Sequence, residues 1–307
     1  MPAQINQNKS NNPKEDSTCE EFVDDASVVV KAKTENELMS KMVLEYEALS
    51  DYLTNHLMVV NKEKTQIMIM HPDKDKAPPT INIQGAQITH QPSIKILGIQ
   101  LTDNLAMDAH IWSGKQNMVK TLNAKTALLR TLKPHLPTKD LANIGSALIN
   151  STISYGAPIW GLTTQQNLDK VQKCQTKAAR LIMSTGWKKG VKKMHRQDML
   201  DNIGWQNTQQ IVNTAILNLT KNAIDGVSAV GINKVFKTTQ PINPRQKAGN
   251  RISHHGKISS NAKTFQVVAP GLYNQLPKEL RNPVLSRLKF KHDLKTHLNT
   301  QLLLTKH

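Results

Sequence analysis

The chain has 307 residues, of which 40 are Lys or Arg and 23 are Asp or Glu, and its formal net charge is +17. Each phosphate that a Lys or Arg neutralises releases bound counterions, so this excess favours a polyanionic partner, with nucleic acid ahead of an anionic membrane surface. The alternative interpretation is a solvated basic surface. Hydrophobic residues make up 38% and aromatic residues 4%, which is low for a compact enzyme of this length.

The cysteines and the hydropathy exclude several classes of protein. Cys19 and Cys174 lie far apart in dissimilar contexts, which argues against a disulfide framework or a structural zinc site. No apolar run approaches the length that spans a bilayer, and the N-terminus has no apolar stretch typical of a secretory signal. We therefore expect an intracellular protein, nuclear or cytoplasmic, with no membrane partner.

The first third of the chain mixes strand and helix patterns. Residues 1–18 are polar and low in complexity, and we expect them to be disordered. A strand, an acidic turn and the strand ASVVVKA follow. Thr34 and Glu37 then predict a capping box at the start of an amphipathic helix, TENELMSKMVLEYEALSDYLTNHL.

Three further β segments follow this helix. Alternating apolar residues predict a strand over residues 66–70, and INIQGAQIT predicts a hairpin with Gly85 in its turn. SIKILGIQLT predicts a single further strand. Strand, helix, strand, hairpin and strand in this order predict a mainly antiparallel sheet with a helix over residues 19–104.

Beyond residue 104 the pattern becomes helical. Apolar periodicity predicts helices near residues 106–132, 138–154, 163–184, 191–203 and 206–224, within a helical region that spans residues 105–230. Residues 231–265 are basic and contain Pro and Gly, which predicts a loop or disordered linker. The last segment, residues 266–307, contains a predicted helix from about residue 284 to 304.

Asp24 and Asp25 form an acidic pair in the sequence Phe-Val-Asp-Asp, between short runs of apolar residues. Adjacent Asp residues are favoured in turns because their side chains hydrogen-bond the local backbone. An aromatic-X-Asp-Asp turn, followed by a buried strand and an amphipathic helix, also resembles the metal-binding hairpin of reverse transcriptases.

Later segments resemble the non-LTR (LINE-type) retrotransposon reverse transcriptases in the same order. VVNKEKTQIMIM, with Asn61, Lys64 and Thr65, resembles the Asn-x-x-Lys-Thr element that follows the palm helix in that family. ILGIQLTDNLAMDAHI, which contains Leu97 and Gly98, resembles the primer-grip strand and its extension. ISYGAPIWG and APGLYNQLPKELR resemble the region beyond the thumb. The resemblance runs from about residue 21 nearly to the C-terminus.

This resemblance implies an α+β fold, with a partial polymerase palm followed by a mainly helical thumb and C-terminal region. It also implies a parent enzyme that copies an RNA template from dNTPs onto a DNA primer or target, with two Mg²⁺ ions. Asp24 and Asp25 would be catalytic metal ligands, because hard cations prefer carboxylate oxygens. Lys64 would protonate the leaving pyrophosphate, or be an ordinary exposed lysine, and Leu97 with Gly98 would contact the primer.

The family's metal site needs another carboxylate, on a strand well upstream of the acidic turn, together with a fingers subdomain. Only 23 residues precede Asp24, and no Asp or Glu among them has a strand-like context. We therefore expect a C-terminal fragment that lacks the fingers and a third ligand and does not polymerise DNA by itself. The alternatives are a non-catalytic basic nucleic-acid-binding protein and a decayed element. The oligomeric state is left open.

Two basic clusters are further candidates for nucleic-acid contacts. Helical spacing places the first cluster on one side of a helix whose other side is apolar. The second cluster flanks Trp187, and its alternative interpretation is a solvated helix face. The first comprises Gln172, Lys173, Lys177 and Arg180, and the second comprises Lys188, Lys189, Lys192, Lys193 and Arg196 together with His195.

Overall fold

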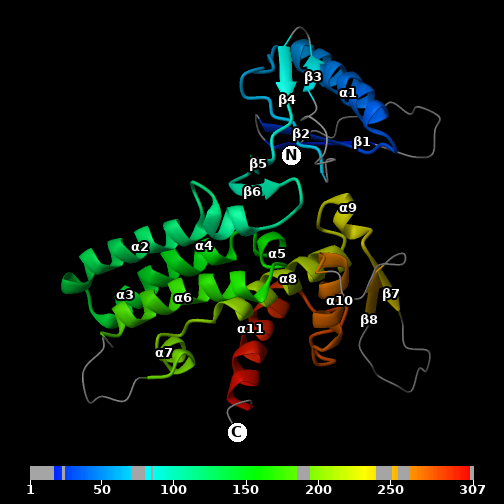
Figure 1. Cartoon of the computed structure of the whole chain (residues 1–307). Coiled ribbons are helices and arrows are strands. Elements are labelled where there is room, and N and C mark those ends of the chain that lie inside the picture. Colours follow the sequence, from blue (N-terminus) through cyan, green and yellow to red (C-terminus); the bar gives the residue numbers. More distant parts are fainter. Residues whose placement is uncertain are drawn as a thin grey trace. The chain divides into compact units, whose positions relative to one another are not determined.

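The computed structural model describes residues 17–22, 25–70, 80–83, 86–184, 194–239, 251–254 and 263–304. The chain divides into two compact units, the first comprising Met1–Ile94 with Thr102–Leu105 and the second Lys95–Leu101 with Ala106–His307. The regular elements of the described residues are helices and small two-stranded sheets (Figure 1), which confirms the α+β class. Among these helices, none is both long enough and apolar enough to cross a membrane.

The acidic turn of the first unit belongs to a hairpin that precedes a long helix. β1 (Ser17–Phe22) pairs antiparallel with β2 (Asp25–Val30), and Phe22 lies opposite Asp25. β1 therefore includes two residues that composition had placed in a disordered tail. α1 (Glu35–Asn55) begins at the predicted Thr34 cap, because the Thr34 hydroxyl accepts a hydrogen bond from the Glu37 N–H at 3.3 Å. The Glu37 carboxylate accepts from the Lys33 N–H at 3.2 Å, whereas the predicted capping box has it accept from the Thr34 N–H.

The rest of the first unit has a small core. β3 (Thr80–Ile83) and β4 (Ala86–Thr89) form the predicted hairpin, whose turn at residues 84–85, Gly85 included, lies outside the described residues. Tyr46, Ile67 and Ile81 are the buried hydrophobic residues of this cluster. The strand predicted over residues 66–70 is wrong. Ile67 forms one bridge with His90, and the Ile69 N–H donates to the His90 imidazole at 3.0 Å, so a side chain takes the donor that a strand ladder would use.

The described strands pair only in twos, which differs from the sheet predicted over residues 19–104. SIKILGIQLT, predicted as one strand, is a hairpin of β5 (Ser93–Ile96) and β6 (Ile99–Thr102). Leu97 and Gly98 connect the two strands with φ values of 45° and 83°. Positive φ at both positions is what a type I′ hairpin turn requires. Glycine adopts it without strain, whereas Leu97 does so only because the surrounding contacts hold it there.

The second unit contains the predicted helices, with several breaks. The first predicted helix, near residues 106–132, is interrupted at Asn117. The Asn117 side chain caps the start of α2 (Met118–Leu132), since it accepts from the Lys120 N–H at 2.9 Å. Single turns of π-helix occur at Ala109–Ser113 and Ser146–Asn150. In chain order the regular helices are α2 (Met118–Leu132), α3 (Thr138–Gly145), α4 (Ser151–Ser154), α5 (Ala157–Trp160), α6 (Gln165–Ile182), α7 (Arg196–Asn202) and α8 (Thr208–Ile224).

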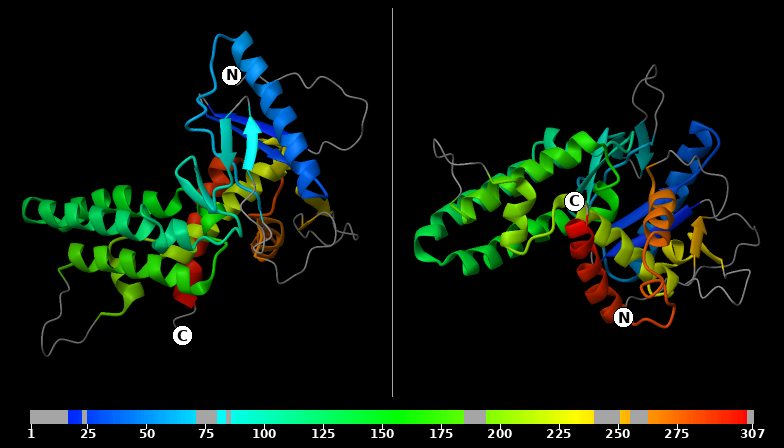
Figure 2. Two further views of the ribbon diagram at one scale, coloured as in Figure 1. Left: turned by 45° about the horizontal axis from the view of Figure 1, so that its top comes forward. Right: turned by 90° about the horizontal axis from the view of Figure 1, so that it is seen from below.

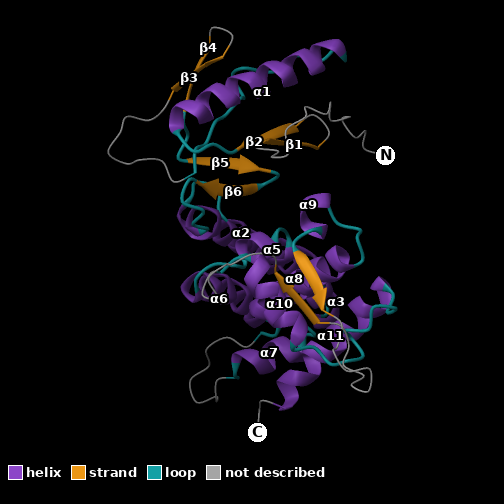
Figure 3. Ribbon diagram, turned by 90° about the vertical axis from the view of Figure 1, so that its right-hand side faces the viewer, coloured by secondary structure: helices purple, strands orange, loops and turns teal. Residues whose placement is uncertain are grey.

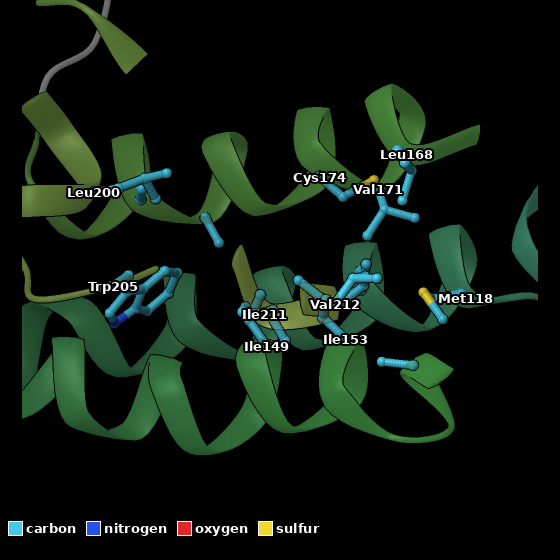
Figure 4. Close-up of a cluster of buried hydrophobic side chains, with 14 of the residues drawn as sticks. Met118, Ile149, Ile153, Leu168, Val171, Cys174, Leu200, Trp205, Ile211 and Val212 are labelled. Carbon is cyan, nitrogen blue, oxygen red and sulfur yellow. The ribbon is translucent and has the colours of Figure 1, made fainter. Parts of the chain in front are cut away.

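One hydrophobic core joins these helices. α2 runs along α6 in both views of Figure 2, and α8 contacts α4, α5 and α6. Val171 of α6, Ile149 and Ile153 are fully buried in the cluster shown in Figure 4. Burying such side chains stabilises the fold by about 1.5 to 3 kcal/mol each. The elements around the hairpin are therefore held by a shared core.

The C-terminal part corrects the prediction of a linker over residues 231–265. α9 (Val230–Asn233) is followed by β7 (Phe236–Thr239), which pairs antiparallel with β8 (Arg251–His254). Figure 1 labels these two strands, and Figure 3 shows them in orange among the helices of the second unit. The polar composition of these residues did not indicate strands. The Asn274 side chain supports β8 from outside the sheet, because it bonds both the N–H and the C=O of Ile252, at 3.0 and 2.9 Å. Asn274 belongs to α10 (Phe265–Asn274), and α11 (Arg287–Leu304) confirms the last predicted helix.

The segment ISYGAPIWG joins the hairpin of β5 and β6 to the helical core. The Tyr155 hydroxyl donates to the carbonyl of Leu97, and the Trp160 indole N–H donates to the Tyr155 carbonyl at 3.0 Å. Gly156 has a φ of 61°, and a Cβ at this position would collide with Cδ1 of the buried Ile99. Glycine avoids both the left-handed strain and this close contact.

Gly156→Ala should therefore lower the free energy of unfolding by about 2 to 3 kcal/mol, through left-handed strain and the collision with Ile99. Gly204→Ala is a matched control, because Gly204 has a φ of 68° and a Cβ added to it would meet nothing within 4 Å. It should cost only about 1 kcal/mol in urea unfolding. Equal losses for the two variants would show that the contact with Ile99 does not constrain the joint.

Candidate functional site

The acidic turn is described only in part. Asp25 is exposed at the first position of β2, and Asp24 lies outside the described residues. Among the described residues, no group of three or more His, Cys, Asp or Glu could hold a metal ion. These residues therefore do not make up a complete metal centre, and the assignment of Asp24 and Asp25 as Mg²⁺ ligands stays a prediction.

The Asn-x-x-Lys-Thr segment forms a compact turn that Asn61 organises. The Asn61 side-chain oxygen accepts from the N–H groups of Glu63 and Lys64, at 3.1 and 3.2 Å. The Asn61 carbonyl accepts from both the N–H and the hydroxyl of Thr65, at 3.1 and 3.0 Å. This geometry explains why Asn and Thr flank the lysine at this spacing. It leaves the Lys64 side chain exposed, which agrees with both interpretations of that residue.

Leu97 and Gly98, the predicted primer contacts, lie at the tip of a hairpin and not within a strand. Both residues are exposed, and the hydrogen bond from Tyr155 fixes the Leu97 carbonyl. The tip therefore presents its backbone in one conformation on the surface of the second unit. The described contacts do not show what binds at the tip, so the role of Leu97 and Gly98 as primer contacts stays a prediction.

The basic face predicted on the helix over residues 163–183 is present on α6. Lys173, Lys177 and Arg180 are exposed at positions i, i+4 and i+7, so they follow one side of the helix. Lys177 Nζ donates to the Asn123 side chain at 3.1 Å, a neutral partner that leaves the charge uncompensated. The arrangement can neutralise consecutive phosphates of a polyanion.

Gln172 was wrongly placed on this basic side. It is only 6% exposed, because its amide belongs to a buried polar network. Its Nε2 donates to Gln175 at 2.9 Å, and its Oε1 accepts from the Thr208 N–H of α8 at 2.9 Å. A buried amide with satisfied donors and acceptors packs as core, which composition could not distinguish from a solvated glutamine.

Lys170 extends the basic row, although sequence reasoning did not select it. Its ammonium lies 3.5 Å from the centre of the Trp112 ring, which places the cation over the aromatic face. The Trp112 indole N–H donates to Asp108 at 2.9 Å, and this hydrogen bond is the largest cause that holds the pKa of Asp108 below its usual range. The spacing of three residues before Lys173 was the signal that could have found Lys170. Lys170, Lys173, Lys177 and Arg180 are hereafter the α6 basic row.

The second predicted cluster lies mostly outside the described residues. Arg196 is exposed at the first position of α7, next to His195, whose side chain caps the helix. The other members, Lys188, Lys189, Lys192 and Lys193, fall in residues 185–193 with Trp187, which the structure does not describe. Their proximity to the α6 basic row stays untested.

Comparison with known proteins gives two similar sequences. No family model and no solved structure matches the chain. Two proteins of Drosophila melanogaster match it over 166 residues, the "RNA-directed DNA polymerase from mobile element jockey" at 24% identity and the "Probable RNA-directed DNA polymerase from transposon X-element" at 22%. Each match covers 54% of this chain and 18% of the relative. The chain thus spans less than a fifth of the length of the curated relatives it matches.

Asn61→Ala should loosen the turn that presents Lys64, because two backbone N–H groups lose their side-chain acceptor. We expect amide hydrogen exchange at residues 63 and 64 to quicken by about tenfold, since a lost hydrogen bond is worth about 0.5 to 1.5 kcal/mol. Asn61→Asp keeps the acceptor oxygen and should retain protection. If both variants exchange like the unmodified chain, the side chain of Asn61 does not hold the turn.

Proposed function

Because this chain is related to the reverse transcriptases of non-LTR retrotransposons, we propose that it is part of an RNA-directed DNA polymerase and binds the nucleic acid that such an enzyme copies. The two relatives are named RNA-directed DNA polymerases. The proposed reaction of the whole enzyme is RNA-templated DNA synthesis from dNTPs on a DNA primer or target. The contribution of the described residues is to bind and position the strands. The α6 basic row is the observation that carries this proposal.

The α6 basic row suits a phosphate backbone better than a protein or a small molecule. Its four cations repeat along one side of an 18-residue helix, and in the described part of the chain none of them forms an ion pair with a carboxylate. Cations in a row repel one another, and a polyanion relieves this repulsion. Asp108, whose pKa the charge of Lys170 helps to lower, offsets part of the repulsion at Lys170. Counterion release adds to the affinity without requiring a particular base sequence.

Catalysis is proposed for the longer polymerase and not for the 307-residue polypeptide alone. Asp24 and Asp25 would hold Mg²⁺, which when bound supplies the positive charge that phosphoryl transfer requires. A complete centre needs a further carboxylate, and the described residues contain no group of three or more His, Cys, Asp or Glu that could hold a metal ion. Lys64, exposed on the turn of Asn61, would be available as a proton donor to pyrophosphate.

A second candidate is a nucleic-acid-binding protein without catalytic activity, or the remnant of a decayed transposable element. The small core of the first unit favours it, because only three of the described hydrophobic residues are buried in that cluster. Leu57 and Val59, beyond the end of α1, are 97% and 91% exposed. Exposed apolar residues beside two-stranded sheets favour aggregation, so poor solubility of the purified chain would support the remnant.

Nucleic-acid binding is tested by fluorescence anisotropy with a labelled oligonucleotide duplex over a series of salt concentrations. The dissociation constant should rise with salt, and Lys173→Gln, Lys177→Gln and Arg180→Gln together should reduce the slope of log K against log salt by about 2 to 3. Lys289→Gln, Lys291→Gln and Lys295→Gln on α11 remove the same charge from other exposed positions and are the control. Equal slopes for both triple variants would reject α6 as the binding face.

Primer extension separates the two candidate functions. We expect the 307-residue chain with Mg²⁺, an RNA template, a DNA primer and dNTPs to incorporate no more nucleotide than Asp24→Asn combined with Asp25→Asn, because an acidic pair alone leaves the metal site incomplete. Incorporation above this control, measured on denaturing gels, would reject both our expectation and the binding-only candidate.

A further inference from the structure

A groove lies in the second unit between the hairpin of β5 and β6, the start of α2, and α4. Its volume is about 460 Å³, within the range of small-ligand pockets. Lys95 and Gly98 line it from the hairpin, Lys125 from α2 and Thr152 from α4. None of the described residues that line it is acidic. The groove therefore has the electrostatic character of an anion site.

Both lysines of the groove have spare hydrogen-bond donors. Lys95 Nζ donates to the Gln116 side chain at 3.3 Å, and Lys125 Nζ donates to the Thr152 hydroxyl at 2.6 Å. Both acceptors are neutral, and within the described ranges neither lysine is paired with a carboxylate. Since an ammonium group carries three N–H donors, each lysine can bind a further acceptor.

His110 adds a buried donor at the same groove. The side chain lines the groove and is only 9% exposed. Its Nδ1 accepts from the Gln100 N–H at 3.4 Å, so a neutral ring carries its proton on Nε2. Burial, followed by the charge of Lys95, lowers the pKa of His110 and keeps the ring neutral near pH 7. Among the described residues, Nε2 has no hydrogen-bond partner.

A buried donor without an acceptor is unfavourable, so a ligand oxygen that accepts from the Nε2–H of His110 would be bound favourably. The start of α2 reinforces this. Asn117, which lines the groove and is 4% exposed, is held by hydrogen bonds from its amide to the carbonyls of Trp112 and Gly114, at 2.8 and 2.7 Å. A 15-residue helix thus begins at the groove with its positive dipole end in a fixed position.

We propose that this groove binds a phosphate group, with Lys95 and Lys125 supplying charge and with the His110 Nε2–H, fully buried in the unbound chain, supplying a donor once a phosphate oxygen displaces the side chains that cover it. Gly98 at the hairpin tip borders the groove, so a strand that contacts the tip would bring its backbone here. The phosphate is therefore a phosphodiester of a bound nucleic-acid strand, an assignment of source that rests on the proposed function.

The first test uses the unaltered full chain, labelled with ¹⁵N at histidine. Long-range ¹H–¹⁵N spectra report the imidazole of His110 while a single-stranded oligonucleotide or inorganic phosphate is titrated. We expect the oligonucleotide to shift the Nε2 resonance of His110 and to saturate at the dissociation constant that anisotropy gives for the same single-stranded oligonucleotide. His110→Gln assigns the resonance by its disappearance.

The second test uses variants that remove two charges. Lys95→Gln with Lys125→Gln should weaken oligonucleotide binding about tenfold and abolish the response of His110, since two phosphate contacts are lost. Lys115→Gln with Lys120→Gln is the control, because both lysines are exposed nearby but do not line the groove. Thermal unfolding of each variant verifies that it is folded.

The outcomes separate this inference from the proposed function. If the chain binds oligonucleotide, but the groove variants bind like the control and His110 does not respond to either ligand, the groove is not a phosphate site. If inorganic phosphate shifts His110 and the oligonucleotide does not, the site stands and its assigned source is wrong. If the chain binds no oligonucleotide, the proposed function fails, and the phosphate titration alone decides for or against the groove.

Discussion

The close approach of a hairpin to the turn at Tyr155 and Gly156 is the contact on which the arrangement of the second unit depends. The Tyr155 hydroxyl holds the Leu97 carbonyl at the hairpin tip, and the missing side chain of Gly156 lets Ile99 pack against the turn. The fully buried Trp160 ties the same turn to the helical core. Without this joint, a two-stranded hairpin would have little stability of its own. It therefore brings the hairpin side of the groove to α2 and α4.

A buried polar network sets the orientation of α6 in a comparable way. Gln175 is fully buried and donates to Asn150 at 2.9 Å and to the Gln206 carbonyl at 2.8 Å, while Gln172 pairs with Thr208. Rotating the helix would leave these amides unsatisfied in the core, at a cost of a few kcal/mol. The polar network thus keeps the α6 basic row on the solvent side, so packing inside the unit decides which charges reach a partner.

Much of the helical part could be predicted, and much of the strand pairing could not. Apolar residues at a period near 3.6 located α1, α2, α6 and α8, because one face of each helix must be buried. The hairpin at Leu97 and Gly98 was missed because Leu-Gly lacks the usual Asn-Gly turn signal. β7 and β8 were missed because their residues are polar and show no strand pattern. The contact that supports β8 comes from the distant side chain of Asn274, which bonds its backbone from outside the sheet. The exposure of Lys173, Lys177 and Arg180 followed from helical spacing, whereas the burial of Gln172 did not.

The sequence by itself determined the basic charge, the helical periodicity and the resemblance to reverse transcriptases, which similarity to two polymerases of mobile elements supports. These properties depend on composition and on residues close in the chain. The tertiary structure alone decided that Lys95, His110 and Lys125 line one groove and that Lys170 joins the α6 basic row over Trp112. Such groupings come from packing between segments that are distant in the sequence. Local residue patterns therefore do not predict which side chains line one groove or which buried donors lack an acceptor.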